Sequence, residues 1–415
     1  MSDTPPGAEA PVDQPHWRGN LFVCMAGSFS TVVAMTLLLP FLPLYVQELG
    51  VRDHAAVVQW SGIAFGITFL SSGLCAPLWG YLADRYGRKS MLIRASLGMA
   101  VAMSLIGMAH NVWQLVALRL LAGLLGGYAS GSMALVAAQT PRARTGWALG
   151  MLSSAIMAGN VAGPLIGGAL PPLIGIRDTF WAAGGVIFLA FVATLTLLRE
   201  QRRPAAGRVN AANAGSNAKV KTGWSAVPRK RPIVVMLVTS ALLAFALMSI
   251  EPIITVYVAQ LVANPDRVTW TAGLVMSATA LGSVLSSARL GRLADRVGHW
   301  LVVTVCLALA ALLLAPQAFV TASWQLVLLR FLMGLALGGL MPCITAVIRH
   351  RVPERSTGAI LGYAVSAQYV GQVLGPLLGG FIGGHLGMRP VFFATAALLA
   401  VGAAWNWREL ASRHA

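Results

Sequence analysis

The stretch LWGYLADRYGRKSML at residues 78–92 concentrates charge in a chain that has little of it. It places Asp84, Arg85, Arg88 and Lys89 within six residues, although charged residues make up only 10% of the 415-residue chain. A second stretch, RLGRLADRVGHWLVV at residues 289–303, has the same Gly-x-Leu-Ala-Asp-Arg-x-Gly core 211 positions later. The recurrence of this hairpin indicates that the chain contains two copies of one structural unit.

Long uncharged, apolar segments lie between such polar hairpins. A helix that crosses the hydrocarbon core of a bilayer needs about 20 consecutive apolar residues, and only helices or closed barrels satisfy their backbone groups there. These segments are too long for barrel strands. We therefore predict an all-α membrane protein with twelve transmembrane helices near 18–47, 55–83, 90–110, 112–139, 146–174, 178–198, 232–262, 268–290, 299–317, 323–348, 357–384 and 389–408.

The net charge of +17 is distributed unevenly between the two sides of this predicted topology. Alternate loops and the termini on one side hold 24 of the 30 Lys and Arg residues, and the other side holds four. This bias is the positive-inside pattern, so we expect both termini to be cytoplasmic and the partner to be the lipid bilayer. A nucleic-acid partner is not expected, since the charge follows the loops.

Further repeats define two halves. WQLVALRLLAGLLGG at 113–127 matches WQLVLLRFLMGLALG at 324–338, and GNVAGPLIGG at 159–168 matches GQVLGPLLGG at 371–380. Six spans per copy give both copies the same orientation, related by a pseudo-twofold axis along the membrane normal. The predicted organisation is a cytoplasmic tail (1–16), a six-helix half (17–198), a basic cytoplasmic linker (199–231) and a second six-helix half (232–410).

These motifs together resemble the major facilitator superfamily. GYLADRYGRKSML is similar to its loop between spans two and three, RLLAGLLGG to its span-four motif, and GNVAGPLIGG to the span-five motif of its twelve-span drug:proton antiporters, most closely the MdtG-type multidrug efflux family. The resemblance implies a proton-coupled exporter of drugs or amphipathic small molecules in a bacterial inner membrane. A monomer that works by alternating access, without cofactor or metal, is expected.

The hairpin residues are the predicted gate. Gly80 would allow close helix approach, and Gly87 would end a helix with a positive φ. Arg85 and Arg88 could equally anchor helix ends among lipid headgroups. The resemblance implies that Asp84 bonds across the two halves and latches the outward-open state, with Asp295 as a weaker counterpart.

The span-five motif places small residues on one helical face. Gly159, Gly163 and Gly167 recur every fourth residue, Gly168 follows, and Pro164 adds a kink. Helix packing alone would explain this pattern, and the family resemblance adds the antiport role. The clear second copy at 371–380 departs from the usual family pattern.

Three ionisable residues lie inside predicted spans, namely Arg119, Arg330 and Glu251. Such residues are costly in a membrane and often mark ion or substrate pathways. Our hypothesis is that Glu251, followed by Pro252, carries the proton, with Arg119 and Arg330 in the same pathway. The alternative is a structural Glu251–Arg330 pair, and the span-one position where the family often has an acid is Leu39.

A substrate cavity is expected near the midplane between the halves. Polar aromatic and amide residues predicted to line it, unless they only bridge helices, are Tyr45, Tyr128, Tyr257, Tyr363, Gln368, Tyr369 and Gln372. The shortage of ionisable groups favours neutral or cationic amphipathic substrates.

Other functions have less support. The sequence has no phosphate-binding Gly-x4-Gly-Lys-Ser/Thr loop, no His-Glu-x-x-His pair and no Gly-x-Ser-x-Gly elbow, so we do not expect an enzyme. The four cysteines show no metal-ligand spacing. A proton-coupled symporter for a sugar or another nutrient remains the main alternative, and a membrane receptor is a weaker one.

Overall fold

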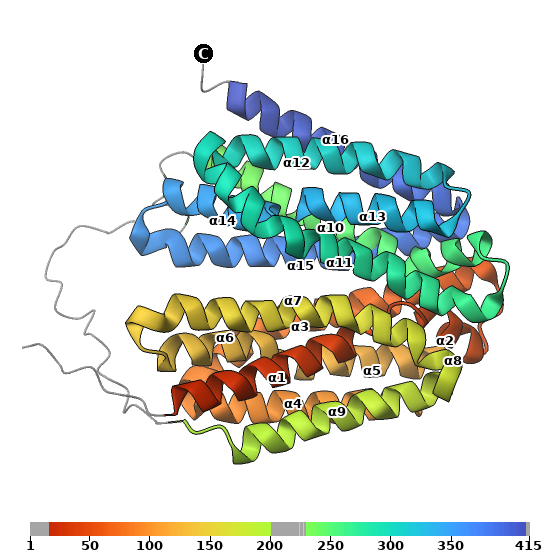
Figure 1. The fold of residues 1–415 in the computed structure, drawn as a ribbon, viewed down its shortest axis with the longest axis horizontal. Helices are drawn as coiled ribbons and strands as arrows, with labels where there is room; N and C mark the ends of the chain where they lie inside the picture. Colours follow the sequence, from red (N-terminus) through yellow and green to blue (C-terminus); the bar gives the residue numbers. More distant parts are fainter. Residues whose placement is uncertain (1–15, 201–223, 225–226, 228–229, 412–415) are drawn as a thin grey trace, which may run out of the picture.

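The computed structural model describes residues 16–200, 224, 227 and 230–411, and the regular elements in these ranges are all helices (Figure 1). Apart from Trp224, Val227 and a few residues at their ends, the predicted tail (1–16) and linker (199–231) lie outside the described residues.

Two groups of helices are arranged side by side (Figure 1). The first group contains α1 (Trp17–Thr36), α2 (Leu42–Glu48), α3 (His54–Tyr86), α4 (Arg88–Ile106), α5 (Val112–Leu125), α6 (Tyr128–Gln139), α7 (Thr145–Ala169), α8 (Pro171–Ile174) and α9 (Ile176–Thr196). The second contains α10 (Lys230–Leu261), α11 (Val268–Val297), α12 (His299–Leu314), α13 (Ser323–Leu337), α14 (Leu340–Arg351), α15 (Glu354–His385) and α16 (Met388–Ala411).

The lengths of these helices agree with a chain that crosses a membrane many times. Within the described ranges, 11 helical segments are long and apolar enough to span a bilayer. The remaining predicted span, 357–384, coincides with α15, which has 32 residues but contains many glycines. The all-helical membrane fold is confirmed, and the count of twelve rests on α15 also crossing.

Several predicted spans are interrupted helices. The first is broken between α1 and α2 around Pro40, and the fourth between α5 and α6 at Gly126 and Gly127. Gly127 adopts φ +102°, which glycine tolerates because it lacks a Cβ. Such breaks leave backbone carbonyls without their helical partners, and side chains from neighbouring helices must satisfy them.

At the α5–α6 break, side chains from α3 and α4 of the same half donate hydrogen bonds to the free carbonyls. The indole Nε1 of Trp79 donates to the carbonyl of Leu124 at 2.8 Å, and Arg94 donates to the carbonyl of Leu125 at 3.0 Å. The Arg94 guanidinium also stacks on the Trp79 ring, 3.5 Å from its centroid. The broken helix is therefore braced by a cation–π pair.

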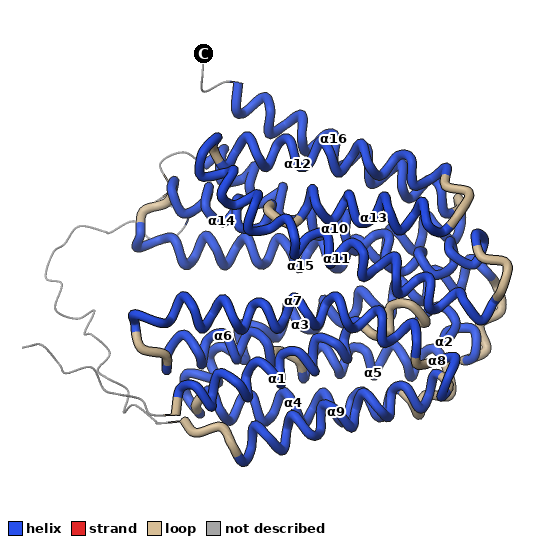
Figure 2. Tube along the Cα trace, in the orientation of Figure 1, coloured by secondary structure: helices blue, strands red, loops and turns tan. Residues whose placement is uncertain are grey.

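The two halves approach each other at one end of the molecule. We call the end at which α9 ends and α10 begins the linker end, and the opposite end the far end. Figure 2 shows the two groups of helices converging toward the far end and diverging toward the linker end. The interface is made mainly by α3 against α15 and by α7 against α11.

At the far end, glycines allow direct contact between backbones. A Cβ at Gly62 of α3 would overlap the carbonyl oxygen of Pro376 and lie 3.3 Å from the Cα of Gly380. The second contact is its repeat-related counterpart. A Cβ at Gly273 of α11 would overlap the carbonyl oxygen of Pro164 and lie 3.3 Å from the Cα of Gly168.

Side-chain hydrogen bonds reinforce the α7–α11 contact. Thr269 Oγ1 donates to the carbonyl of Gly168 at 3.0 Å, and Ser277 Oγ donates to the carbonyl of Val161 at 2.7 Å. Both donors lie on α11 and both acceptors on α7, so these bonds join the two halves. The far end is consequently held closed by close backbone packing plus hydrogen bonds.

We predict that Gly273→Leu prevents this closure. Carbon atoms need a separation of about 3.5–4.0 Å, which the contact at Gly168 does not provide for a side chain. Spin labels at residues 51 and 264, one in each half, should then report a longer distance than in the wild type. The control is Gly150→Leu on α7, because no atom lies within 4 Å of a Cβ there. An unchanged distance in Gly273→Leu would contradict the prediction.

Candidate functional site

Three ionisable side chains lie within the helical bundle, as predicted. Arg119 on α5 and Arg330 on α13 are 1% and 3% exposed, and they occupy equivalent positions in the two repeats. Glu251 lies on α10, within electrostatic range of Arg330. The second half thus contains a carboxylate and a guanidinium deep inside it.

Glu251 and Arg330 do not form a direct ion pair. Their charged atoms are not within 4.0 Å of each other, and the Oε2 atom of Glu251 is enclosed without a hydrogen-bond partner in the described structure. The Nε atom of Arg330 also has no partner. Because an enclosed and unsatisfied charge is costly, this arrangement favours proton uptake over a permanent structural pair. The structural alternative is not realised in this conformation.

Arg119 has a different environment from its repeat partner. Its Nε donates to the carbonyl of Ala64 on α3 at 3.2 Å, while one terminal nitrogen is buried without a partner. The first-half position that corresponds to Glu251 is Leu39, which is buried. A carboxylate interaction like that of Arg330 is thus absent around Arg119, so its predicted part in proton coupling gains no support from the geometry.

The signature hairpin is built around Gly87. This residue ends α3 with φ +96°, as the sequence predicted. The carboxylate of Glu200 accepts hydrogen bonds from the backbone nitrogens of Arg88 and Lys89, both at 2.9 Å, and so caps the start of α4. Glu200 was not predicted from the sequence, although the Leu-Arg-Glu at 198–200 resembles the Trp-Arg-Glu at 407–409.

The other predicted gating residues make few contacts. Asp84 and Arg85 are exposed, and no described side chain or backbone group forms a hydrogen bond or ion pair with Asp84. Arg88 donates to the carbonyl of Ala134, and Asp295 pairs with His299 at 3.3 Å.

The close helix contact predicted at Gly80 is not formed in this conformation, and it stays a prediction for the state in which the linker end is closed. No atom lies within 4 Å of a Cβ placed on Gly80, so Gly80 does not permit a close helix contact here. The reason is that the halves are apart at the linker end, where the hairpin lies (Figure 1).

The span-five motif has two contact faces. Cβ atoms at Gly159, Gly163 and Gly167 would meet α1, so these residues pack within the first half. Pro164 and Gly168 instead face α11 of the second half, through the far-end contact described above. The motif therefore combines the expected helix packing with a contribution to the closed far end.

Three predicted cavity tyrosines are internal to their own halves. Tyr45 donates to the carbonyl of Ile106 at 2.5 Å, and its repeat equivalent Tyr257 donates to the carbonyl of Gln317 at 2.8 Å. Tyr128 shares a hydrogen bond with Thr194 at 2.7 Å. All three are nearly inaccessible. Their predicted contact with substrate is wrong for this conformation, because each hydroxyl is buried and already bonded.

The remaining predicted cavity residues lie on α15. Leu374 and Leu378 are each 45% exposed and mark the face of α15 that meets lipid. At 100° per residue, Gln368 lies about 80–120° and Gln372 about 120–160° around the helix from these leucines, and both are half-buried.

The two tyrosines of α15 occupy different surroundings. The ring of Tyr369 packs against Gly73 of α3, and Tyr363 stacks edge-on against Trp224 at 6.2 Å. The remaining candidates for contact with substrate therefore lie on the side of α15 that faces the other half.

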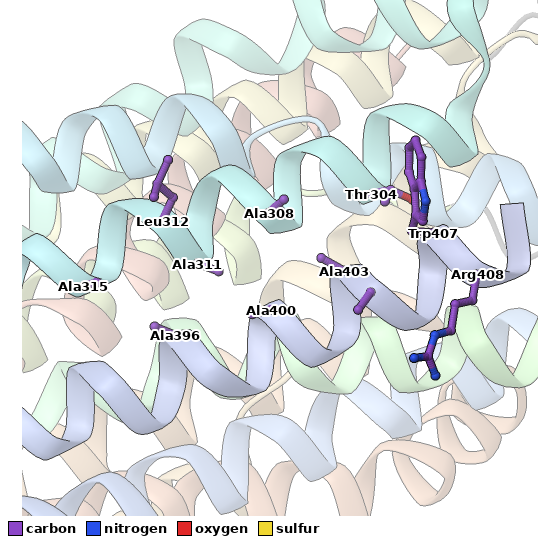
Figure 3. Close-up of a pocket in the computed structure, with 11 residues that line it drawn as sticks. Thr304, Ala308, Ala311, Leu312, Ala315, Ala396, Ala400, Ala403, Trp407 and Arg408 are labelled. Atoms are coloured by element: carbon purple, nitrogen blue, oxygen red, sulfur yellow. The ribbon is translucent and has the colours of Figure 1, made fainter. Parts of the chain in front are cut away.

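A wide groove lies away from this surface. A groove of about 680 Å³ between α12 and α16 is lined mostly by alanines, with Trp407 and Arg408 at its linker end (Figure 3). It lies on the outer edge of the second half, away from α3 and α7 (Figure 1). Its size reflects small side chains on a surface that meets lipid, so we do not regard it as the substrate site.

A smaller cleft of about 350 Å³ lies at the far end, with residues from both halves in its walls, including Glu48 and Asp266. Although Glu48 is exposed overall, partial burial of its carboxyl raises its pKa above the ordinary value of 4.5, and the positive charge of Arg177 lowers it in part. This cleft is a carboxylate-bearing surface where the halves meet.

Comparisons with known proteins agree with this architecture. The chain matches the sequence model of the Major Facilitator Superfamily over residues 24–298 and 269–414. Multidrug resistance protein MdtG of Salmonella arizonae is 40% identical over 405 residues, which cover 97% of this chain and 98% of that protein. MdtG of Salmonella choleraesuis matches with the same identity and coverage.

Solved structures share the fold at low sequence identity. A bacterial homologue of the human lysosomal transporter Spinster, in an inward-facing and unoccupied conformation, has a TM-score of 0.74 and 15% identity over 98% of both chains. The human organic anion transporter MFSD10 has a TM-score of 0.67 and 19% identity, over 94% of this chain and 100% of that one.

We predict that Tyr45→Phe and Tyr257→Phe each lower the free energy of unfolding by about 1 kcal/mol, since each removes one buried hydrogen bond. Substrate affinity should not change. Thermal unfolding and equilibrium binding of a fluorescent drug would test both statements, with Tyr81→Phe, an exposed residue outside the predicted cavity, as the control. A large loss of affinity with unchanged stability would restore these tyrosines to the substrate site.

We also predict that pH acts on the far end through Glu48. Opening the cleft would solvate the carboxyl and return its pKa toward 4.5, so the raised pKa stabilises the closed form only while the carboxyl is protonated. That contribution is present below pH 4.5 and is lost as the pH rises through the raised pKa. The far-end spin-label distance should lengthen with rising pH, and Glu48→Gln should weaken this dependence. A dependence of equal size in Glu48→Gln would exclude this role.

Proposed function

The chain belongs to the major facilitator superfamily, and on this basis we propose that it exports drug-like small molecules by alternating access in exchange for protons. It is a multi-pass membrane transporter and not an enzyme. Multidrug resistance proteins at 40% identity over nearly the whole chain support drug efflux. We infer a bacterial inner membrane as the location, since the similar multidrug resistance proteins are bacterial.

The conformation fits one state of such a cycle. The excess of Lys and Arg at the linker end supports a cytoplasmic position for that end and for both termini. With the far end closed by its glycine contacts, the molecule would then face inward. An unpartnered Asp84 is the expected condition of a latch that closes the cytoplasmic end only in the outward-open state.

Glu251 is the residue that we propose as the proton carrier. The observation that carries this proposal is its enclosed and unpartnered Oε2 atom close to the buried Arg330. A carboxylate in such a place is stabilised either by a proton or by a closer approach of the guanidinium. Glu251 would take up a proton from the outside when the far end is open and still hold it in the arrangement seen here. A closer approach of the Arg330 guanidinium would then replace the proton, which leaves to the cytoplasm while the linker end is open.

The substrate surface that we propose lies between the halves beside α15. Gln368, Gln372 and Tyr369 offer hydrogen-bonding groups without charge, and all three are half-buried, unlike the exposed leucines of the same helix. This chemistry suits neutral or cationic amphipathic molecules. A single chain contains both halves of the pathway, so we propose a monomer that needs no cofactor.

We predict that Glu251→Gln abolishes proton-driven efflux and leaves exchange of labelled drug between the two sides intact. Glutamine keeps the size and polarity of the side chain but cannot carry a proton. Proteoliposomes with an internal pH dye and a cationic dye as substrate would measure both activities. The control is Asp178→Asn on α9, which removes an exposed carboxylate.

The possible results distinguish antiport through Glu251, antiport through another residue, and symport. Proton counterflow that disappears only in Glu251→Gln supports antiport with Glu251 in the pathway. Counterflow that persists in Glu251→Gln moves the coupling site elsewhere. Acidification of the interior with inward substrate flux would instead indicate symport, the alternative for nutrient uptake.

A further inference from the structure

The linker end of α11 carries three arginines on one helical face. At 100° per residue, Arg289, Arg292 and Arg296 fall within an arc of about 80° that also contains Leu281 and Leu285. The two leucines are 42% and 47% exposed, and all three arginines are exposed. An apolar stripe therefore continues directly into a cationic one along the same helix.

This face of α11 is directed away from the rest of the protein. Gly273 and Ser277 turn toward α7, whereas Gly282 turns toward α13. The arginine face lies on the sector that neither neighbour covers. In a membrane protein, exposed leucines on such a sector are in contact with lipid, so the arginines lie where that lipid surface reaches its polar boundary.

The first repeat has no arginines at the positions equivalent to Arg289 and Arg292 on α11. The equivalent face of α3 carries Leu70, Leu74, Leu78 and Tyr81, which are 41%, 73%, 51% and 62% exposed. Arg289 and Arg292 thus occupy the positions of Leu78 and Tyr81. Membrane insertion succeeds in the first repeat with apolar or aromatic residues at these positions, so the second repeat has acquired a cationic surface for another reason.

The arginine side chains point back along α11 toward the membrane interior. Arg289 donates to the carbonyl of Leu285 at 3.1 Å and Arg292 to the carbonyl of Ala288 at 3.4 Å. Side chains on a helix lean toward its N-terminus, which for α11 is the far end of the molecule. The guanidinium groups are therefore drawn toward the depth of lipid phosphates instead of extending into water.

Together these side chains form a hollow. Arg289, Arg292, Leu293 and Arg296 line a space of about 260 Å³. The carboxylate on this segment, Asp295, is paired with His299 at 3.3 Å. Three positively charged side chains therefore line this space, and the carboxylate of Asp295 is paired with His299 and is not among the lining residues.

We propose that this hollow binds the phosphate headgroup of an anionic phospholipid, whose acyl chain lies along Leu281 and Leu285. Guanidinium groups match the geometry of phosphate oxygens and are less strongly hydrated than ammonium groups. Basic pockets on the cytoplasmic side of transmembrane helices suit anionic headgroups. The leucines beside the arginines favour a lipid over a soluble phosphate, because they provide an apolar surface that only a lipid would use.

The test replaces Arg289 and Arg292 with leucine and tyrosine, the residues at the equivalent positions 78 and 81 of the first repeat. Native mass spectrometry of the purified full chain would count bound phosphatidylglycerol, with phosphatidylcholine as the zwitterionic comparison. The variant Arg289→Leu with Arg292→Tyr should bind phosphatidylglycerol roughly 30-fold more weakly, since each basic residue near the surface contributes about a fivefold factor. Arg289→Lys with Arg292→Lys should retain most of the binding.

The control variant removes two positive charges at the linker end but outside the hollow. Arg349→Gln with Arg408→Gln eliminates two exposed arginines at the linker end but leaves the hollow intact. It should keep wild-type lipid binding. Three results would overturn the proposal: equal loss in this control, no loss in the Leu/Tyr variant, or displacement of the lipid by millimolar inorganic phosphate. Gel filtration of each variant establishes that it is folded.

Discussion

The close approach of glycines to backbone carbonyls at the far end is the contact on which the rest of the structure depends. Helices with side chains at Gly62 and Gly273 could not come this near to Pro376 and Pro164. The contact occurs twice because the chain is duplicated, so the two halves meet symmetrically. The halves meet at the far end and are apart at the linker end, and the hairpin with Asp84 is exposed there.

The same packing explains why two buried arginines can have unequal functions. Symmetry places Arg119 and Arg330 at equivalent depth, but among the described residues a carboxylate lies near Arg330 and none lies near Arg119. A buried charge without a partner costs several kcal/mol. Binding of a proton to a carboxylate, or the approach of an oppositely charged side chain, removes that cost and so stabilises the protein. In the proposed cycle, this stabilisation occurs in the second half, when Glu251 binds a proton.

The sequence predicted the features that repeat or that a membrane imposes. Apolar length gave the spans, loop charges gave their expected orientation, and the need for a positive φ identified Gly87. The three buried tyrosines were misassigned because a sequence does not reveal whether a hydroxyl faces a cavity or a carbonyl such as that of Ile106. Gly62 and Gly273 were missed because their importance depends on which helix of the other half reaches them. Glu200 was missed for a similar reason, since its partners are backbone nitrogens more than a hundred residues away.

The break between α5 and α6 has a mechanical consequence. Its counterpart in the second half, at Gly338 and Gly339, keeps right-handed backbone angles, and Leu290 and Val305 stand where the first half has Trp79 and Arg94. One repeat therefore contains a sharp joint held by a cation–π brace, and the other contains a nearly continuous rod. Two halves of equal topology but unequal stiffness cannot deform equally when the transporter changes state, so its motion is expected to be lopsided even though its architecture is symmetric.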